Sequence, residues 1–322
     1  MPQTNPMLPT QPHKDDSHPS HFKAPFRALT VIGCGLLGGS WLMAAKESNP
    51  TLHTRAVDTN AETLQYLLKA QAVDDVSLTL PSQWEPNHLV IIATHLTASL
   101  DVLKQLTPLV ENDPTIIVSD IGSCKRAIVA LGQELLPNQF IGGHPLAGKE
   151  VSGVHHATSL LFTGKPYVLC PNEANLTADY AQRVASLTHF IETTLRARVG
   201  MQPVETHDRA MAFVSHLPQL YAVVLTQLLS HNRPGELLAF HGAGMDGHLR
   251  LAASPYEMWH DIVLQNADNL KEVIGQCKEL LVQLEDQLHC IHTTPTKDPT
   301  ALLAQWFASA NTIHQRFHQA KQ

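Results

Sequence analysis

The sequence has no segment typical of a membrane or secreted protein. Across its 322 residues, no uninterrupted apolar run approaches the ~18 residues that a bilayer-spanning helix needs. The N-terminus also lacks the charged-then-apolar layout of a secretory signal. The five cysteines are odd in number and lack CxxC spacing, which predicts reduced thiols and argues against a disulfide or zinc framework. We therefore expect a cytoplasmic protein that does not bind membranes.

Positive charge is scarce as well. The chain has 22 Lys and Arg against 29 Asp and Glu, which gives a formal net charge of −7. Without a basic footprint, nucleic-acid binding is disfavoured. The 20 histidines include no HExxH or other metal-ligand spacing, so no metal site is expected. A hydrophobic content of 43% over this length fits a globular protein of two domains.

What the sequence does contain is a glycine motif between an apolar run and a helical pattern. Residues 31–40 read VIGCGLLGGS, in which Gly33, Gly35 and Gly38 fit GxGxxG. Gly33 would permit a tight turn, Gly35 would let the backbone approach a pyrophosphate, and Gly38 would let the helix pack closely on its strand. The start of that helix would then face the anion with unpaired N–H groups. The motif alone is weak, because glycine turns between a strand and a helix are common.

The segment that follows strengthens this interpretation. The next apolar run ends in AVD and places Asp58 twenty residues after Gly38, where a carboxylate can accept hydrogen bonds from ribose hydroxyls. Because an aspartate would repel the additional phosphate of NADP, the cofactor is predicted to be NAD, with NADP disfavoured. The predicted cofactor-binding residues are Gly33, Gly35, Leu36, Leu37, Gly38, Asp58 and Thr94.

From residue 26 to about 202, short β-like runs alternate with helical ones, which predicts βαβ units and a Rossmann-type doubly wound parallel sheet. Residues 1–25 are rich in Pro, Gln and His and are expected to be a disordered tail. The strand candidates are 28–32, 54–57, 88–93, 115–119, 139–142 and 167–170, with a short run at 196–200. The helix candidates are 36–48, 60–71, 97–110, 123–135 and 175–194.

After residue 203 the pattern is helical, which predicts an all-helical C-terminal domain over 203–322. The helix candidates there are 205–230, 234–241, 255–290 and 298–320. Segment 255–290 is longer than a typical globular helix of ~8–20 residues. We infer a homodimer that interlocks through the helical domain; a monomeric bundle with a break near Gly275 would also explain this length.

Two polar stretches at expected strand ends are candidates for chemistry. Residues 141–153 read IGGHPLAGKEVSG, and a histidine held in a glycine–proline loop beside a nucleotide site is a plausible general base, which makes His144 the main catalytic candidate. Ser123, in SDIGSCKR, would also lie at this edge of the sheet. Its hydroxyl at the start of a helix is equally explained by N-capping.

Two further stretches belong to the predicted helical domain. In THDRAMAFVSHLPQL, 206–220, a proline interrupts a helical pattern, and a kink that turns Ser215 and His216 toward a cleft is as plausible as a simple packing bend. In GAGMDGHLRLAAS, 242–254, Arg250 follows a glycine-rich turn and could clamp a substrate carboxylate. A plain surface charge explains Arg250 as well.

Taken together, these blocks resemble the prephenate/arogenate (cyclohexadienyl) dehydrogenase family of tyrosine biosynthesis. GCGLLGGS, DIGSCK, GGHPLAGKEVSG, LFTGKPYVLCP and HDRAMAFVSHLP match family blocks in the same order, and the resemblance runs from about residue 28 to 290. It implies an NAD-linked oxidative decarboxylation of a cyclohexadienyl ring. His144 would accept the proton of the ring hydroxyl, and Ser123 would orient both groups. Arg250 would bind a substrate carboxylate, and Ser215 and His216 would line the pocket.

The chain also departs from the family pattern. Many members have SHLPH where this chain has SHLPQ, so Gln219 replaces a histidine that is thought to read the substrate side chain. Prephenate and arogenate therefore both stay open as the small-molecule substrate. A β-hydroxyacid-type dehydrogenase is disfavoured, because residues 205–260 hold no lysine to serve as a proton donor. A non-catalytic NAD-binding protein is disfavoured too, because Ser123, His144 and Arg250 are all present.

Overall fold

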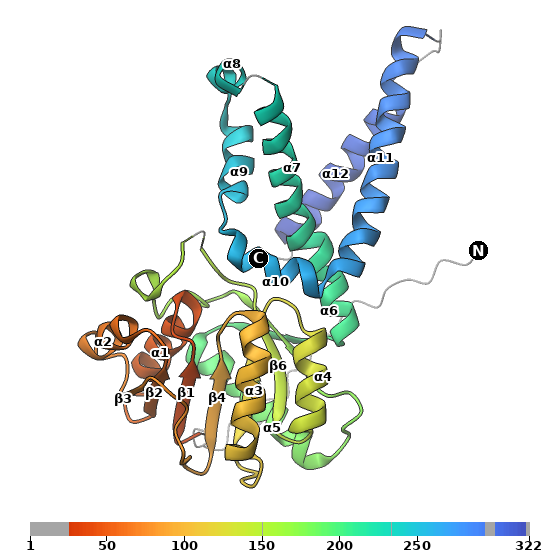
Figure 1. The fold of residues 1–322 in the computed structure, drawn as a ribbon. Coiled ribbons are helices and arrows are strands. Elements are labelled where there is room, and N and C mark those ends of the chain that lie inside the picture. Colours follow the sequence, from red (N-terminus) through yellow and green to blue (C-terminus); the bar gives the residue numbers. More distant parts are fainter. Residues whose placement is uncertain (1–25, 150, 233, 294–299, 320–322) are drawn as a thin grey trace.

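The computed structural model describes residues 26–149, 151–232, 234–293 and 300–319. The predicted N-terminal tail, 1–25, lies outside the described residues. Eight strands form one sheet in the order β3-β2-β1-β4-β5-β6-β7-β8, with helices on both faces (Figure 1). The strands are β1 Ala28–Ile32, β2 His53–Val57, β3 Asp75–Ser77, β4 His88–Ile92, β5 Ile117–Asp120, β6 Phe140–Pro145, β7 Pro166–Cys170 and β8 Arg198–Met201.

The order of β3 to β6 is that of a Rossmann-type sheet, which confirms the predicted fold class. Every pairing is parallel except that of β6 with β7, so the sheet is mostly and not wholly parallel. The sequence analysis missed β3, a strand of three residues at the sheet edge. A strand this short has too little hydrophobic alternation to be recognised.

Alternate residues of the central strands serve two separate cores. Leu89 and Ile91 of β4 belong to the core on one face of the sheet, which includes Trp41. Val90 and Ile92 belong to the core on the other face, which includes Leu103 of α3 (Leu96–Val110). Such strands read as continuous hydrophobic runs because both of their faces are buried. The helices of this part are α1 Leu36–Ser48, α2 Ala61–Lys69, α3 Leu96–Val110, α4 Arg126–Leu135 and α5 Ala178–Phe190, followed by a π-helical turn at Ile191–Leu195. A short 3₁₀ turn, Val154–His156, follows β6.

After β8 the described chain is helical, as predicted. The elements are α6 Val204–Met211, a π-helical turn Ala212–His216, α7 Leu217–His231, α8 Pro234–Leu237, a 3₁₀ turn Leu238–Phe240, α9 Ala243–Ala252, α10 Tyr256–Gln265, α11 Ala267–Thr293 and α12 Ala301–Gln319. The arm made of α7 and α9 and the long α11 diverge above the sheet (Figure 1).

Two details of this helical part differ from the sequence-based expectation. The segment predicted as one helix over 255–290 breaks at Asn266, and α11 runs without interruption through Gly275, where a break was considered. Arg250 lies inside α9 and does not follow a glycine turn as expected, because Gly244 and Gly247 are themselves helical. Glycine lowers helix propensity by only about 1 kcal/mol relative to alanine, which tertiary contacts can override.

The predicted interruption near Pro218 is present as a π-helical turn, Ala212–His216, between α6 and α7. Pro218 lies at the start of α7, where its missing N–H costs little. The combined helical segment 204–231 is long and apolar enough to cross a membrane by length and composition, and only 22% of its most apolar window is buried inside the protein. Nevertheless, its His207 and His216 are buried and hydrogen-bonded to polar groups.

Two aspartates of the helical part cap helices of the Rossmann-type part. Neither α3 nor α4 has a side-chain cap of its own at its first residues. Asp261 of α10 accepts a hydrogen bond from the backbone N–H of Thr97, at 2.8 Å. Asp208 of α6 accepts hydrogen bonds from the N–H groups of Lys125 and Arg126, at 2.8 and 3.0 Å. Because a negative charge at a helix N-terminus is stabilising, these contacts fix the helical part on the sheet edge.

Candidate active site

The three glycines of the turn have different surroundings. Gly33 has a φ of +91°, and a Cβ there would lie 2.8 Å from the Ala93 carbonyl. At Gly38, a Cβ would lie 2.0 Å from the carbonyl oxygen of Gly33, so only glycine lets α1 pack on the turn. A Cβ at Gly35 would meet nothing within 4 Å. Thus Gly33 and Gly38 shape the turn, and Gly35 faces open space.

The start of α1, beside Gly35, leaves backbone N–H groups without side-chain partners. Helix α1 begins there without a side-chain cap and without an acidic residue in its first turn, so Leu36 and Leu37 start a helix whose N–H groups are free of side-chain partners. Asp58, at the end of β2, accepts a hydrogen bond from the backbone N–H of Cys34 at 2.7 Å. Its carboxylate is therefore fixed next to the turn, where a ribose would lie. Thr94 follows β4 and its hydroxyl lies 2.9 Å from that of Ser99.

Exchanging the two glycines for alanine should separate folding from cofactor binding. We expect Gly35→Ala to fold with wild-type stability but to weaken NAD binding by about tenfold, because its methyl group enters the space of the pyrophosphate. Gly38→Ala should lower the free energy of unfolding by about 1–3 kcal/mol, since its methyl group overlaps the Gly33 carbonyl. Urea unfolding and NAD titration measure both effects. Equal NAD affinity of Gly35→Ala and wild type would contradict this assignment.

His144 lies on β6, paired with Val168 of β7, and not in a loop as expected. The neighbouring glycines explain the difference, because they serve close packing within the sheet. A Cβ at Gly143 would lie 2.7 Å from the carbonyl oxygen of Asp120, and one at Gly142 would lie 2.5 Å from Val129. The catalytic candidate is therefore held by β6, which pairs with β5 on one side and β7 on the other.

A buried chain of hydrogen bonds begins at His144. Its Nδ1 lies 2.9 Å from Nε2 of His207, and Nδ1 of His207 lies 2.7 Å from Oδ1 of Asp208. All three side chains are buried. Burial alone would raise the pKa of Asp208, but hydrogen bonds from His207 and from the backbone of α4 lower it below its usual value. Asp208 is therefore ionised and can only accept hydrogen bonds.

The protons of this chain can be assigned from Asp208 outward. An accepting carboxylate requires a proton on Nδ1 of His207, and when His207 carries only that proton its Nε2 is the acceptor. Nδ1 of His144 must then donate, which leaves Nε2 of His144 without a proton. Burial, together with His207, Lys125 and His216, holds the pKa of His144 well below its usual value. His144 is therefore neutral at pH 7 and offers a bare Nε2 to a ligand.

A buried ion pair supports the strand that carries His144. Nζ of Lys125 contacts the carboxylate of Asp120 and donates to the carbonyl oxygen of Gly143 at 2.7 Å. Asp120 in turn accepts hydrogen bonds from the N–H groups of Gly143 and Gly122, at 3.1 and 2.8 Å. Lys125 and Asp120 are almost completely buried, with 0% and 1% exposure. These bonds fix the backbone next to His144.

The other predicted catalytic and substrate-binding residues differ in burial and in their contacts. Ser123 is half-buried in the turn between β5 and α4; it does not cap α4, which begins at Arg126 and is capped by Asp208. Ser215 is exposed on the π-helical turn, whereas His216 is buried. Gln219 is buried and donates from Nε2 to the carbonyl of Leu251 at 2.7 Å, which joins α7 to α9. Arg250, beside Leu251, is exposed.

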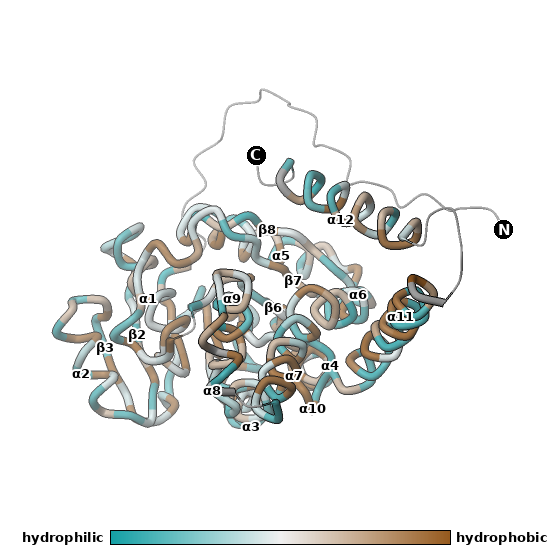
Figure 2. Tube along the Cα trace, turned by 90° about the horizontal axis from the view of Figure 1, so that it is seen from above, coloured by the Kyte–Doolittle hydropathy of each residue, from teal (hydrophilic) through white to brown (hydrophobic). Residues whose placement is uncertain are grey.

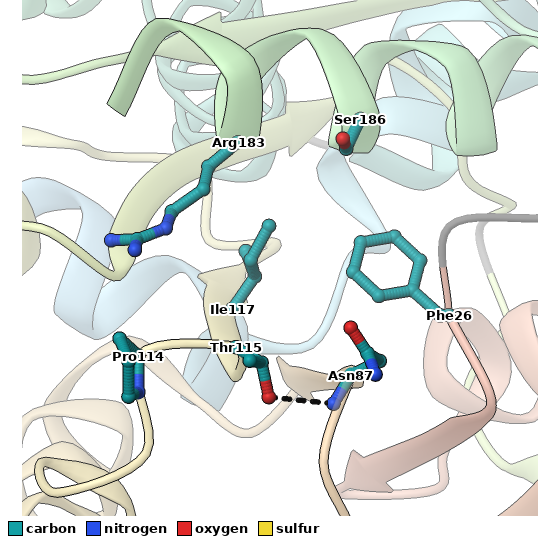
Figure 3. A pocket seen from close by; sticks show the side chains of 7 residues that line it. All are labelled: Phe26, Asn87, Pro114, Thr115, Ile117, Arg183 and Ser186. Atoms are coloured by element: carbon teal, nitrogen blue, oxygen red, sulfur yellow. Dashed lines mark hydrogen bonds between the residues drawn. The ribbon is translucent and has the colours of Figure 1, made fainter. Parts of the chain in front are cut away.

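Two concavities on the described residues lie away from His144. A pocket of about 170 Å³ opens at the amino ends of β4 and β5, lined by Phe26, Asn87 and Arg183 among others (Figure 3). A groove of about 600 Å³ lies beside α1 and α2 and includes Tyr66 and Ser159. His144 instead lies beyond the carboxyl ends of the parallel strands, where ligands bind in sheets of this kind.

Two family models match the chain, one over the Rossmann-type part and one over the helical part. The family model described as "Prephenate dehydrogenase, nucleotide-binding domain" matches residues 43–199, and "Prephenate dehydrogenase, dimerization domain" matches residues 203–305. The chain belongs to the prephenate dehydrogenase family. The resemblance inferred from the sequence blocks is therefore confirmed.

Individual members of the family show how far the similarity extends. The chain is 32% identical over 247 residues to a prephenate dehydrogenase of Bacillus subtilis, which covers 75% of this chain and 65% of that protein. It therefore spans just under two thirds of the length of this relative. It is 27% identical over 253 residues to a cyclohexadienyl dehydrogenase of Zymomonas mobilis, covering 77% of this chain and 84% of the relative.

Solved structures share the fold. Prephenate dehydrogenase from Aquifex aeolicus in complex with hydroxyphenyl propionate and NAD+ superimposes with a TM-score of 0.79 at 23% identity, covering 91% of this chain and 98% of that one. Arogenate dehydrogenase from Synechocystis superimposes with a TM-score of 0.71 at 24% identity, covering 89% and 99%. This chain therefore has the same overall fold as these two structures.

Sequence reasoning missed most of the polar groups that surround His144. His207 and Asp208 were included only as part of the predicted helix 205–230, and Lys125 and Asn266 were not considered. Nothing in their local pattern distinguishes them from surface residues.

Proposed function

We propose that the protein catalyses the NAD-linked oxidative decarboxylation of prephenate, arogenate or both, in the cytoplasm, as a step of tyrosine biosynthesis. The observation that carries the proposal is the buried chain from Asp208 to His144, which leaves a neutral acceptor at the edge of a sheet that also carries the dinucleotide turn. Membership of the prephenate dehydrogenase family supports it.

NAD is the proposed cofactor. The turn at Gly33, Gly35 and Gly38 would hold its pyrophosphate on the N-terminus of α1, with Leu36 and Leu37, and Asp58 would accept hydrogen bonds from its ribose. Thr94 would lie beside the nicotinamide at the end of β4. When bound, NAD would supply the hydride acceptor.

The chain's own residues would supply alignment and a place for the proton. As hydride leaves the ring carbon that bears the hydroxyl, Nε2 of His144 would accept the hydroxyl proton. Loss of CO₂ from the opposite carbon would return the electron pair to the ring, which becomes aromatic. The proton would finally return to the phenol oxygen, so the reaction needs no further acid.

Other residues are assigned to substrate positioning. Ser123, on the neighbouring strand end, would orient the ring hydroxyl and His144, and Arg250 would bind a substrate carboxylate. Ser215, His216 and Gln219 would line the pocket from the π-helical turn and α7. We further propose that residues 26–202 form the dinucleotide-binding domain and 203–322 the substrate and dimerisation domain.

The helical part is proposed to form a homodimer. The long helices leave large apolar side chains exposed, including Val224 and Leu228 on α7 and Leu280 and Leu288 on α11. Apolar residues recur along these helices in the view from above (Figure 2). A second copy packed between the diverging arms would bury them, which also explains the apolar character of segment 204–231. No nucleic acid or membrane is proposed as a partner.

Product stoichiometry tests the reaction type. With substrate labelled at the ring carboxyl, we expect one labelled CO₂ for each NADH formed. NADH without CO₂ would indicate a simple alcohol oxidation and would contradict the proposed decarboxylation.

Changing Asp58 tests the cofactor assignment. Asp58→Ser should accept NADP measurably, because it removes the negative charge that repels the additional phosphate. Asp58→Asn removes the same charge with a smaller change of shape and should also accept NADP; its amide keeps an oxygen for the N–H of Cys34, whereas the N–H of Asn60 loses its acceptor. Kinetics with NAD and NADP measure the selectivity. Continued full rejection of NADP by both variants would show that Asp58 is not the discriminating residue.

Changing Gln219 tests the substrate preference. Gln219→His should raise the ratio of kcat/KM for prephenate to that for arogenate by about tenfold, if this position reads the substrate side chain. Gln227→His, at an exposed site on the same helix, is the control. An unaltered ratio in Gln219→His would remove Gln219 from substrate recognition.

A further inference from the structure

His216 has a buried ring nitrogen that the hydrogen bonds of the described residues do not use. Its side chain is 1% exposed, and Nε2 has no partner among the described residues. The ring meets Trp259 edge-on, at 6.0 Å between centroids. A buried polar atom without a partner is costly and calls for an explanation, such as a bound ligand or an ordered water.

The other ring nitrogen shows which proton His216 carries. Nδ1 lies 3.0 Å from Nδ2 of Asn266, and the same Nδ2 lies 2.8 Å from the backbone carbonyl oxygen of Asp208. A carbonyl oxygen can only accept, so the Asn266 atom beside it must be the NH₂ group. The amide oxygen of Asn266 is used separately, accepting from Asn269 at 2.8 Å. The orientation of the amide is therefore determined by the hydrogen bonds around it.

With its NH₂ group facing Nδ1, Asn266 donates to His216, and Nδ1 is the acceptor. A neutral histidine carries one proton, so the proton is on Nε2. Burial lowers the pKa of His216 to about 4, against the opposing effect of Asp208, and His207 lowers it further. The side chain is consequently neutral at pH 7 and points an unused N–H donor away from Asn266.

From this geometry we propose that Asn266 is a positioning residue that fixes His216 as the Nε2–H tautomer, so that His216 donates a hydrogen bond to a carboxylate oxygen of the bound substrate. This role rests on the proposed function and adds a specific donor to it. His144 and His216 then have opposite roles, because the first presents a bare acceptor and the second a donor. Both assignments begin at Asp208, one from its carboxylate and the other from its backbone carbonyl.

A carboxylate suits this donor better than a neutral group does. A hydrogen bond to an ionised acceptor is about twice as strong as one between neutral groups. His216 is joined to Asp208 through Asn266, and His144 is joined to the same residue through His207, so the donor belongs to the same buried network. Both candidate substrates carry carboxylates that could accept this hydrogen bond.

Histidine NMR tests the proposal without turnover. In protein labelled with ¹⁵N-histidine, and with the His216 signals assigned by their loss in His216→Gln, we expect a protonated Nε2 and an unprotonated Nδ1. In Asn266→Leu, which removes the donor, the two tautomers should both be populated. Asn232→Leu, at an exposed asparagine on the end of α7, should leave the spectrum of His216 unchanged.

The same NAD-saturated sample tests the ligand class. Hydroxyphenyl propionate should shift the Nε2 signal of His216, and its Kd should rise about three- to tenfold in Asn266→Leu, whereas the uncharged hydroxyphenyl propanol should bind both proteins alike. A proton on Nδ1 of His216 in the wild type, or an equal response to the two ligands, would overturn the proposal. An inactive wild-type enzyme with the expected tautomer would instead contradict the proposed reaction.

Discussion

Replacing His144 by asparagine should lower kcat by roughly 10²-fold or more and leave NAD affinity nearly unchanged. Asparagine keeps a polar side chain on β6 but has no basic nitrogen to accept the hydroxyl proton. The effect should fall on kcat because the proton moves only as hydride leaves. Steady-state kinetics and NAD titration measure the two quantities separately.

His231→Asn is the control for this experiment, since it makes the same change at an exposed site on α7. It should retain wild-type kcat. A wild-type rate in His144→Asn would remove His144 from the mechanism. A loss of NAD affinity equal to the loss of rate would instead assign His144 to cofactor binding.

Replacing Asp208 by asparagine should lower kcat by a similar factor, roughly 10²-fold, although Asp208 lies two hydrogen bonds away from Nε2 of His144. Oδ1 of Asp208 accepts from both His207 and the N–H of Lys125, so an asparagine sets its NH₂ group against a backbone donor in either orientation. The charged acceptor that holds the proton on Nδ1 of His207 is lost, and with it the tautomer of His144 that presents a bare Nε2 to the substrate hydroxyl. Asp208 is thus a positioning residue, and its effect should appear in kcat more than in KM.

Asp261→Asn separates this effect from loss of the helix cap. Asp261 caps α3 as Asp208 caps α4, but it has no hydrogen bond to the histidine chain among the described contacts. Each variant should lose about 1 kcal/mol of stability in urea unfolding, as expected for a weakened N-cap. Only Asp208→Asn should lose rate. Equal losses of rate in the two variants would show that docking of the helical part, and not the tautomer, controls catalysis.

The sheet could be predicted from the sequence because its strands carry strong local signals. Ala28–Ile32 and Leu36–Ser48 agree with the prediction at both ends, since the glycine turn between them leaves little freedom. The helical character of residues after 203 was predicted, but the positions at which its helices begin and end were not. The break at Asn266 depends on hydrogen bonds to Asp208 and His216, which are distant in sequence.

The candidate site shows the same limit. His144 was recognised by its glycine-rich neighbourhood, although those glycines pack the strand against Asp120 and Val129 and do not form a loop. The residues that set its tautomer come from α6, more than 60 positions later, and no local pattern links them to it. Sequence could therefore indicate which residue reacts, but the contacts between the two parts of the chain were needed to infer its protonation.

The most direct test of the account offers prephenate and arogenate separately to the wild-type protein with NAD and follows NADH by its near-ultraviolet absorbance. We predict NADH formation with at least one of the two substrates, and its near-complete loss in His144→Asn. Folded protein that binds NAD but forms NADH with neither substrate would contradict the proposed function.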